Sequence, residues 1–173
     1  MQAPRVQLRA AGVGDAVAIA SVQCDAWRAG YAGIMPSQVL EVMSVDDCAN
    51  RWRAALAKPG RGCYKVAVCD GQIVAFATYG PARDHGFEGA ELVALNVLPE
   101  FWRQGLGREL LVRIIAELKT AYSSLYLWVA RDNIGARRFY ETQGFTVSGQ
   151  EKQHPEHGNI VETCYRLCLQ SPS

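Results

Sequence analysis

The residues of this sequence that most clearly suggest chemistry are Gly105 and Gly107, in the stretch LNVLPEFWRQGLGREL. An apolar segment ends at Pro99, and the two glycines open an amphipathic segment rich in leucine. Glycines at such a strand-to-helix turn allow successive main-chain N–H groups to approach an anion, which the helix dipole also attracts. Arg103 and Arg108 flank the turn and add positive charge for contact with phosphate. The stretch therefore predicts an anion-binding turn, with a pyrophosphate as the favoured anion.

Other interpretations of the glycine turn compete with this one. A Walker loop requires Gly-Lys-Ser/Thr to reach terminal phosphates, but Gly107 is followed by Arg108 and Glu109. The dinucleotide fingerprint G-x-G-x-x-G requires a third glycine, and Leu110 occupies that position. A turn that merely needs a flexible backbone stays open as a structural alternative, because Gly-x-Gly alone does not exclude it. The segments on either side of the turn are therefore needed to choose between these interpretations.

The segments around the turn predict a strand–helix–strand–helix unit between residues 90 and 143. AELVALNVL and SLYLWVA are typical of strands, and NIGARRFYETQ is typical of a helix that Gly144 ends in the left-handed conformation. The helix after the turn is predicted from apolar residues at helical spacing, which are Leu106, Leu110, Leu111, Ile114 and Leu118. Such a unit implies locally parallel strands.

The remaining segments predict antiparallel strands and further helices. VQLRA is typical of a first strand, and Asp70-Gly71 joins two strands in CYKVAVCDGQIVAFATYG as a hairpin. Helices are predicted over 14–31, in MPSQVLEVM with Ser37 as its cap, and after Ser44 as a second cap. FTVSGQEKQ and IVETCYRLCL predict a closing hairpin. The predicted class is a single-domain α/β or α+β fold with a mixed sheet.

The composition limits the possible functions. The chain has 173 residues, of which 49% are hydrophobic and 20% charged, and its net charge of +1 argues against a nucleic-acid or membrane partner. No apolar run is long enough to span a membrane, and MQAPRVQLRA has no apolar signal region, so we expect a cytosolic protein. No pair of the six cysteines has C-x-x-C spacing, and we expect buried, reduced thiols. His154 and His157 lie on either side of Pro155, so no metal is expected.

Taken together, these segments resemble the GCN5-related N-acetyltransferase (GNAT) family over nearly the whole chain. WRAGYAGIMP is similar to the family's N-terminal helical segment, ELVALNVLPEFWRQGLGRELL to its acetyl-CoA core, and WVARDNIGARRFYETQGF to its second cofactor segment. The family loop Q/R-x-x-G-x-G/A falls on residues 102–107, with Trp102 in the place of Gln or Arg. The resemblance implies the acyl-CoA N-acyltransferase fold, a mostly antiparallel seven-stranded sheet with a central parallel pair and flanking helices.

The resemblance also implies the residues that hold acetyl-CoA, the expected acyl donor. The loop binds the pyrophosphate, the end of the preceding strand pairs with the pantetheine arm, and the N–H group of Val97 stabilises the oxyanion. Asn133 hydrogen-bonds the pantetheine, or serves only as a helix cap. The implied cofactor-binding residues are Leu95, Asn96, Val97, Trp102, Arg103, Gln104, Gly105, Leu106, Gly107, Arg108, Asn133 and Tyr140.

Glu91 is implied as the general base, because it lies fourteen residues before Gly105, as a catalytic glutamate does in the histone-acetylating branch. A carboxylate in the apolar stretch AELVALNV is also conspicuous by itself, and alternation predicts that it shares a face with Val93, Leu95 and Val97. The alternatives are a solvated carboxylate at the strand end and a water chain as the base.

Tyr140 is implied as the general acid that protonates the departing sulfur. It lies seven residues after Asn133, which is two helical turns, so both side chains project from one side of the helix. Its phenol is uncharged at neutral pH, as an acid requires. The alternative is a core aromatic beside Phe139.

Trp27, Tyr31 and the polar loop YGPARDHGFEG lie where the family builds its acceptor pocket, although ordinary packing and a solvated loop are the alternatives. We therefore expect an enzyme that transfers an acetyl group to a primary amine of a small molecule or peptide by direct attack in a ternary complex. A homodimer through the edge of the C-terminal hairpin is expected. The rival functions are a non-catalytic acyl-CoA sensor and a nucleotide-binding protein for ATP or NAD.

Overall fold

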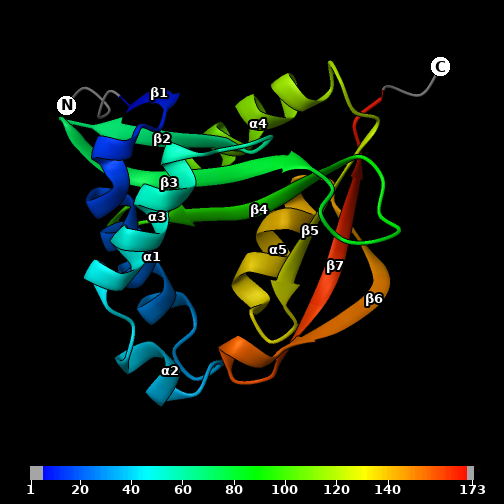
Figure 1. The fold of residues 1–173 in the computed structure, drawn as a ribbon. Helices are drawn as coiled ribbons and strands as arrows, with labels where there is room; N and C mark the ends of the chain where they lie inside the picture. Colours follow the sequence, from blue (N-terminus) through cyan, green and yellow to red (C-terminus); the bar gives the residue numbers. More distant parts are fainter. Residues whose placement is uncertain (1–5, 171–173) are drawn as a thin grey trace.

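In a computed structural model that describes residues 6–170, the chain forms one seven-stranded sheet with the order β1-β2-β3-β4-β5-β7-β6 (Figure 1). Neighbouring strands are antiparallel except for the central pair β4 and β5, which is parallel. The strands are β1 (Val6–Ala10), β2 (Cys63–Cys69), β3 (Gln72–Pro81), β4 (Ala90–Val97), β5 (Ser124–Ala130), β6 (Thr146–His154) and β7 (Ile160–Cys168). The predicted mixed sheet with a central parallel pair is confirmed.

Helices cover both faces of this sheet. They are α1 (Ala16–Gly30), α2 (Ser37–Glu41), α3 (Val45–Ala57), α4 (Leu106–Leu118) and α5 (Ile134–Thr142), with short 3-10 helices at Val13–Asp15, Pro99–Phe101 and Pro155–His157. On one face, Ile19 of α1 and Leu56 of α3 pack against Val66 and Phe76 of the sheet. On the other face, the apolar side of α4 and Tyr140 of α5 belong to the largest core cluster.

Local signals in the sequence account for many of the element boundaries. The Asp70-Gly71 pair turns the β2–β3 hairpin with φ values of 48° and 80°, as a primed turn requires. Ser44 caps α3 by accepting a hydrogen bond from the Asp47 N–H group at 3.3 Å, as predicted. The prediction for Ser37 is wrong: Pro36 is the N-cap of α2, and Ser37 is the first residue inside the helix.

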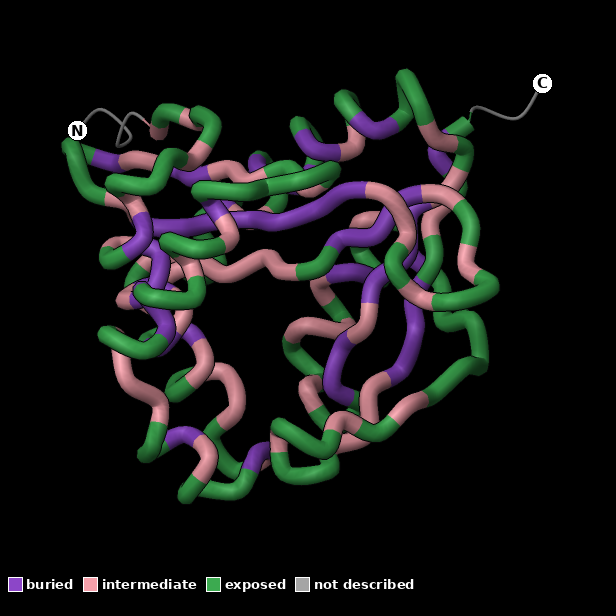
Figure 2. Tube along the Cα trace, viewed as in Figure 1, coloured by how far each residue is buried: buried purple, intermediate pink, exposed green. Residues whose placement is uncertain are grey.

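The central parallel pair opens partway along its length. β4 and β5 pair only where Ala90–Leu92 lie opposite Leu125–Leu127, although both strands continue beyond this point. The last five residues of β4 are therefore half-buried or exposed at the centre of the sheet, whereas its first three residues are buried (Figure 2). This opening between two neighbouring strands is the main irregularity of the fold.

A bulge in β4 lies at the same place. Thr78 pairs with Ala94 and Tyr79 with Leu92, so Val93 has no partner on β3. The bulge shifts the alternation of side chains, and Leu92 and Leu95 therefore belong to the same core cluster. The predicted shared face of Glu91 and Leu95 is wrong for this reason: Glu91 lies on the opposite face, which α1 and α3 cover further along the sheet.

The structure tests the expectation of buried, reduced thiols and shows whether a helix could span a membrane. Four cysteines are buried, but Cys63 and Cys168 are exposed because they lie at strand ends, so the expectation of six buried thiols is wrong for these two. All six are free thiols. Between residues 6 and 170, none of the helices combines the length and the apolar character needed to cross a bilayer.

Candidate active site

The N-terminus of α4 has unsatisfied main-chain donors. Its N-cap, Gly105, has a φ of 84° and offers no side chain to bind the first turn. Within residues 6–170, none of the N–H groups from Arg103 to Arg108 donates to an acceptor at hydrogen-bond distance. Residues Trp102–Arg108 are called the glycine loop below. Its free donors and the positive end of the α4 dipole form a site for an anion.

The glycine loop lies directly beside the opening of the sheet. A Cβ atom built on Gly107 would lie 3.6 Å from Phe139 of α5 and 3.8 Å from Val97 of β4. The predicted loop residues Arg103 and Arg108 are exposed and follow the same turn. An anion bound by the loop would therefore sit at the end of β4, where the strands separate.

The longer side chains of the glycine loop are committed to other contacts. The Trp102 indole N–H donates to the carbonyl oxygen of Val97 at 2.7 Å, and its ring lies near Gly30 of α1. The Gln104 amide donates to the Glu100 carbonyl oxygen at 2.6 Å. These two side chains brace the loop, so its anion-binding capacity comes from the main chain.

The open edge of β4 carries further main-chain groups, among which the Val97 carbonyl oxygen is bound by the Trp102 indole. Leu98 donates its N–H to the Val74 carbonyl oxygen of β3 at 2.9 Å. Because main-chain groups alternate along an antiparallel pair, those of Asn96 also face β3, whereas those of Leu95 and Val97 face the opening. The structure therefore brings Leu95 and Val97 to the opening, but the main chain of Asn96 is turned away from it.

Glu91 is buried and held by an arginine that the sequence analysis did not pair with it. Its side chain is 3% exposed, and its two oxygens accept hydrogen bonds from Nε and Nη2 of Arg83, both at 2.8 Å. The Tyr126 hydroxyl lies 3.2 Å from the same carboxylate. The carboxylate raises the pKa of the Arg83 guanidinium above its usual range. Both oxygens of the predicted base thus have a donor.

Asp84 is fixed in the same region by side chains of β5. The Trp128 indole N–H donates to its carboxylate at 2.8 Å, and the Tyr126 hydroxyl lies 3.1 Å from the same oxygen. The ring of Phe87 packs on Tyr126, with 4.5 Å between centroids. Asp84 and Phe87 of this loop are therefore packed on the sheet, whereas the rest of its polar side chains, those of Arg83, His85 and Glu88, are exposed as expected. The term polar face is used below for the face of β4, β5 and β7 that carries Glu91, Tyr126, Trp128 and Glu162.

Tyr31 and Tyr140 approach each other from different layers of the molecule. Tyr140 is buried between Phe139 and Phe145, and burial raises the pKa of its phenol, with Tyr31 acting in the same direction. Burial also raises the pKa of Tyr31 to about 12, and the negative charge of Glu162 adds to this. Within residues 6–170 neither hydroxyl has a hydrogen-bond partner. Both phenols therefore stay protonated at neutral pH with free hydrogen-bonding capacity.

The tip of the β6–β7 hairpin closes over the C-terminal end of α1. Trp27 meets His157 edge to face at 4.8 Å, and His157 stacks on His154 at 3.8 Å. Gly158 lies so close to Pro36 that a Cβ atom there would come within 2.7 Å of the ring. The two imidazoles are parallel to within 10°, so they form a wall and do not converge on a common point. Sequence reasoning did not foresee this wall beside the predicted acceptor residues.

Asn133 is the N-cap of α5, and its side-chain oxygen accepts a hydrogen bond from the Ala136 N–H group at 3.1 Å.

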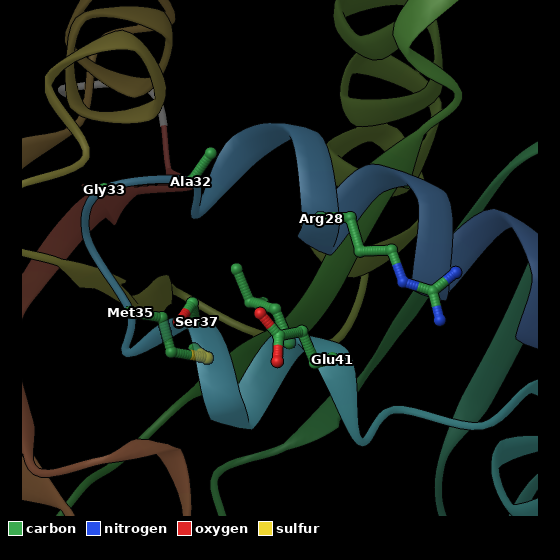
Figure 3. A pocket seen from close by; sticks show the side chains of 7 residues that line it. Arg28, Ala32, Gly33, Met35, Ser37 and Glu41 are labelled. Carbon is green, nitrogen blue, oxygen red and sulfur yellow. The ribbon is translucent and has the colours of Figure 1, made fainter.

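A separate depression of about 400 Å³ lies between the end of α1 and α2, where Met35 and Leu40 form its apolar lining (Figure 3). None of its lining residues belongs to the glycine loop or to the polar face. The chemistry of the side chains therefore places the candidate site at the sheet opening and not in this depression.

Comparison with known proteins gives consistent matches. The family model described as Acetyltransferase (GNAT) family matches residues 24–145. The uncharacterised N-acetyltransferase YuaI of Bacillus subtilis (strain 168) is 34% identical over 132 residues, which cover 74% of this chain and 73% of that protein.

Solved structures share the fold at lower sequence identity. The PaiA N-acetyltransferase from Thermoplasma acidophilum, in complex with coenzyme A, matches with a TM-score of 0.73 and 20% identity, over 92% of this chain and 98% of that one. The ribosomal-protein-S18-alanine N-acetyltransferase from Escherichia coli matches with a TM-score of 0.69 and 22% identity, over 98% and 97% of the two chains.

Proposed function

The chain belongs to the Acetyltransferase (GNAT) family, and we propose that it transfers the acetyl group of acetyl-CoA to a primary amine of a small molecule or peptide. The amine attacks directly in a ternary complex, without a covalent enzyme intermediate. The observation that carries this proposal is the uncapped N-terminus of α4, whose free N–H groups lie at the sheet opening.

The donor half of the site fits the chemical parts of acetyl-CoA. The N–H groups from Arg103 to Arg108 bind the pyrophosphate, because they are the free donors at a helix N-terminus. The main-chain groups of Leu95 pair with the pantetheine arm as an added strand would, next to the free N–H group of Val97, and Asn133 assists from the start of α5. The thioester, when bound, supplies an electrophilic carbonyl carbon next to a sulfur leaving group.

The chain's own groups then assist the transfer. The Val97 N–H group stabilises the oxyanion, because it faces the opening and has no partner strand there. Tyr140 protonates the departing sulfur, since its buried phenol keeps its proton at neutral pH. Trp27 and Tyr31 line the approach of the acceptor.

Glu91 stays our sequence-based prediction for the general base, and Arg83 sets the conditions for that role. A carboxylate that accepts two hydrogen bonds from a guanidinium must release one of them before it takes up a proton. An acid-base role therefore requires Arg83, which is 64% exposed, to move away from Glu91 during turnover. A homodimer through β6, an edge strand of the sheet, also remains a prediction.

The donor proposal is tested by thermal shift with acetyl-CoA, ATP and NAD, because a ligand that binds the folded chain raises the Tm. We expect stabilisation by acetyl-CoA at micromolar concentration and none by the two nucleotides. Stabilisation by ATP or NAD but not by acetyl-CoA would overturn the proposal in favour of a nucleotide-binding protein.

The transfer itself is tested by release of free CoA across amino acids, polyamines, and peptides that begin with alanine or contain lysine. The alanine peptide is included because a structural relative acts on ribosomal protein S18 alanine. Binding of acetyl-CoA without CoA release from any of these amines would favour the sensor.

A further inference from the structure

The carboxylates of the polar face and its loop differ in the donors that surround them. Glu91 and Asp84 each accept hydrogen bonds from protein side chains. Within residues 6–170, Glu162 accepts none, although its side chain is only 14% exposed. The nearest cation is Lys152, whose Nζ atom lies 4.0 Å from Oε2. A carboxylate that is largely removed from water and still has free lone pairs has the capacity to bind a donor from outside the chain.

Glu162 also lies where the sheet opening meets α1. It pairs across the strands with Ala130, the last residue of β5, which is beyond the point where β5 has left β4. Its negative charge acts on the pKa of Tyr31, the C-cap of α1. Among residues 6–170, neither the Glu162 carboxylate nor the hydroxyls of Tyr31 and Tyr140 have a hydrogen-bond partner.

On the basis of the proposed acetyl transfer, we propose that Glu162, in place of the Arg83-bound Glu91 that the sequence predicts, receives the ammonium group of the acceptor and removes its proton. A primary amine at neutral pH is a cation with three N–H donors, which a carboxylate without donors binds directly. The ring of Trp27 packs on that of Tyr31, with 5.2 Å between the centroids, and aromatic rings attract cations. The acceptor class that fits is therefore an amine that binds as its ammonium ion.

The step balances as follows. A proton passes from the ammonium nitrogen to a Glu162 oxygen, and the freed electron pair forms the carbon–nitrogen bond at the thioester carbon. The carbon–sulfur bond breaks, and Tyr140 gives its phenol proton to the sulfur. Tyr140 regains a proton from the nitrogen, which loses its surplus proton as the amide forms. Glu162 releases its proton to solvent, so each transfer produces an amide, free CoA and one proton.

The environment of Glu162 suits a group that takes up a proton. Burial raises the pKa of its carboxyl, and the charges of Asp84 and Glu91 act in the same direction. Lys152 and His154 on β6 act in the opposite direction and lower the pKa of Glu162. A base works best when its pKa lies near the operating pH, so an upward shift favours this role.

The first test is Glu162→Gln, which keeps the shape of the side chain but removes its charge. We expect kcat/KM for spermidine and for a peptide that begins with alanine to fall by about 100-fold at pH 7. The acidic limb of the pH–rate profile should flatten, and the Kd for acetyl-CoA should not change. Calorimetry on CoA-loaded protein should show at least about tenfold weaker binding of the same amines, which needs no turnover.

Two variants serve as comparisons. Glu151→Gln removes the same charge from the same hairpin, but this residue is exposed and pairs with Arg131 at 3.5 Å, so activity and amine binding should stay within about twofold. Glu91→Gln tests the other carboxylate. The assignment is overturned if Glu162→Gln keeps its acidic limb while Glu91→Gln loses it, or if the wild-type chain binds none of the amines. Acetyl-CoA binding without transfer would instead contradict the proposed function. In that case, calorimetry of amine binding would still show whether Glu162 binds the ammonium group.

A stability measurement separates this role from a structural ion pair with Lys152. Because burial raises the folded-state pKa of Glu162, its stabilising contribution is complete below the pKa of the unfolded chain and is lost as the pH rises through the folded pKa. Glu162→Gln should therefore raise the Tm at pH 7 and make little difference at pH 4. A lower Tm of the variant at pH 7 would show a structural ion pair and overturn the assignment.

Discussion

The glycine loop and the polar face border the same opening between β4 and β5, but different atoms form their functional surfaces. The loop offers main-chain N–H groups, and its side chains at Trp102 and Gln104 are used for bracing. The polar face offers the carboxylates of Glu91 and Glu162 and the phenol of Tyr126, and Arg83 contacts it from the adjacent loop. The donor half should therefore respond to backbone changes, and the acceptor half to the loss of single side-chain atoms.

The largest effect is expected from a side-chain change outside both surfaces, Tyr140→Phe in α5. Removing one oxygen removes the proton donor for the leaving sulfur, so kcat should fall by about 100-fold while the Kd for acetyl-CoA stays the same. Because burial keeps this phenol protonated, its ionisation should cause no decrease of the wild-type rate below about pH 10. Steady-state kinetics and calorimetry give both values.

The matched control for this variant is Tyr122→Phe, which removes a phenol from the core beside the end of α4. Its kcat should stay within about twofold of wild type. An equal loss of kcat in both variants would mean that Tyr140 acts through packing.

The second-largest effect is expected from a change in the main chain of the glycine loop, Gly105→Ala. A side chain at a φ of 84° costs about 1–2 kcal/mol, which the loop can relieve only by turning its N–H groups away from a common centre. The Kd for acetyl-CoA should rise by about tenfold. Gly71→Ala has the same strain at a φ of 80° and the same open surroundings, so it should lower the Tm equally without changing the Kd. Equal Kd values in the two variants would refute the main-chain cradle.

A smaller effect is expected from Arg83→Gln, measured as urea-induced unfolding. The variant leaves the buried Glu91 carboxylate with only Tyr126 as a donor, which should lower the free energy of unfolding by about 2 kcal/mol. The loss is not larger because the guanidinium of Arg83 is in contact with water, which weakens the ion pair. Arg113→Gln breaks an exposed helix pair with Glu109 at 3.2 Å and should cost less than about 0.5 kcal/mol. A cost for Arg83→Gln as small as that of the control would show that Glu91 does not need its partner.

The smallest effect is expected from the removal of a charged side chain from the glycine loop. Arg108→Ala removes a charge from the glycine loop but none of its main-chain donors, so the Kd for acetyl-CoA should rise only about threefold at low salt. At 0.5 M salt the difference should vanish, because exposed charges are screened. A loss larger than that of Gly105→Ala would move the anion site from the main chain to the side chains.

The sequence predicted the parts of the fold that depend on neighbouring residues. The hairpin at Asp70-Gly71, the Ser44 cap and the glycine turn before α4 are local, because each depends on backbone preferences within a few positions. The prediction of the Glu91 face was wrong because the bulge at Val93 depends on pairing with β3. Glu162 did leave a signal, since it is a carboxylate in an apolar strand as Glu91 is, but only the pairing of β7 with β5 shows where it lies.

The sequence by itself determined the mixed sheet, the order of its elements and the glycine turn before α4, because these follow from periodicity and from glycine within one short segment. Only the tertiary structure decided that Arg83 holds Glu91, that Tyr31 approaches Tyr140 and that Glu162 is left without a donor. These contacts join residues far apart in the chain, and their geometry depends on where β4 and β5 separate. Burial and hydrogen bonding of a charged group are properties of that packing, and no local pattern contains them.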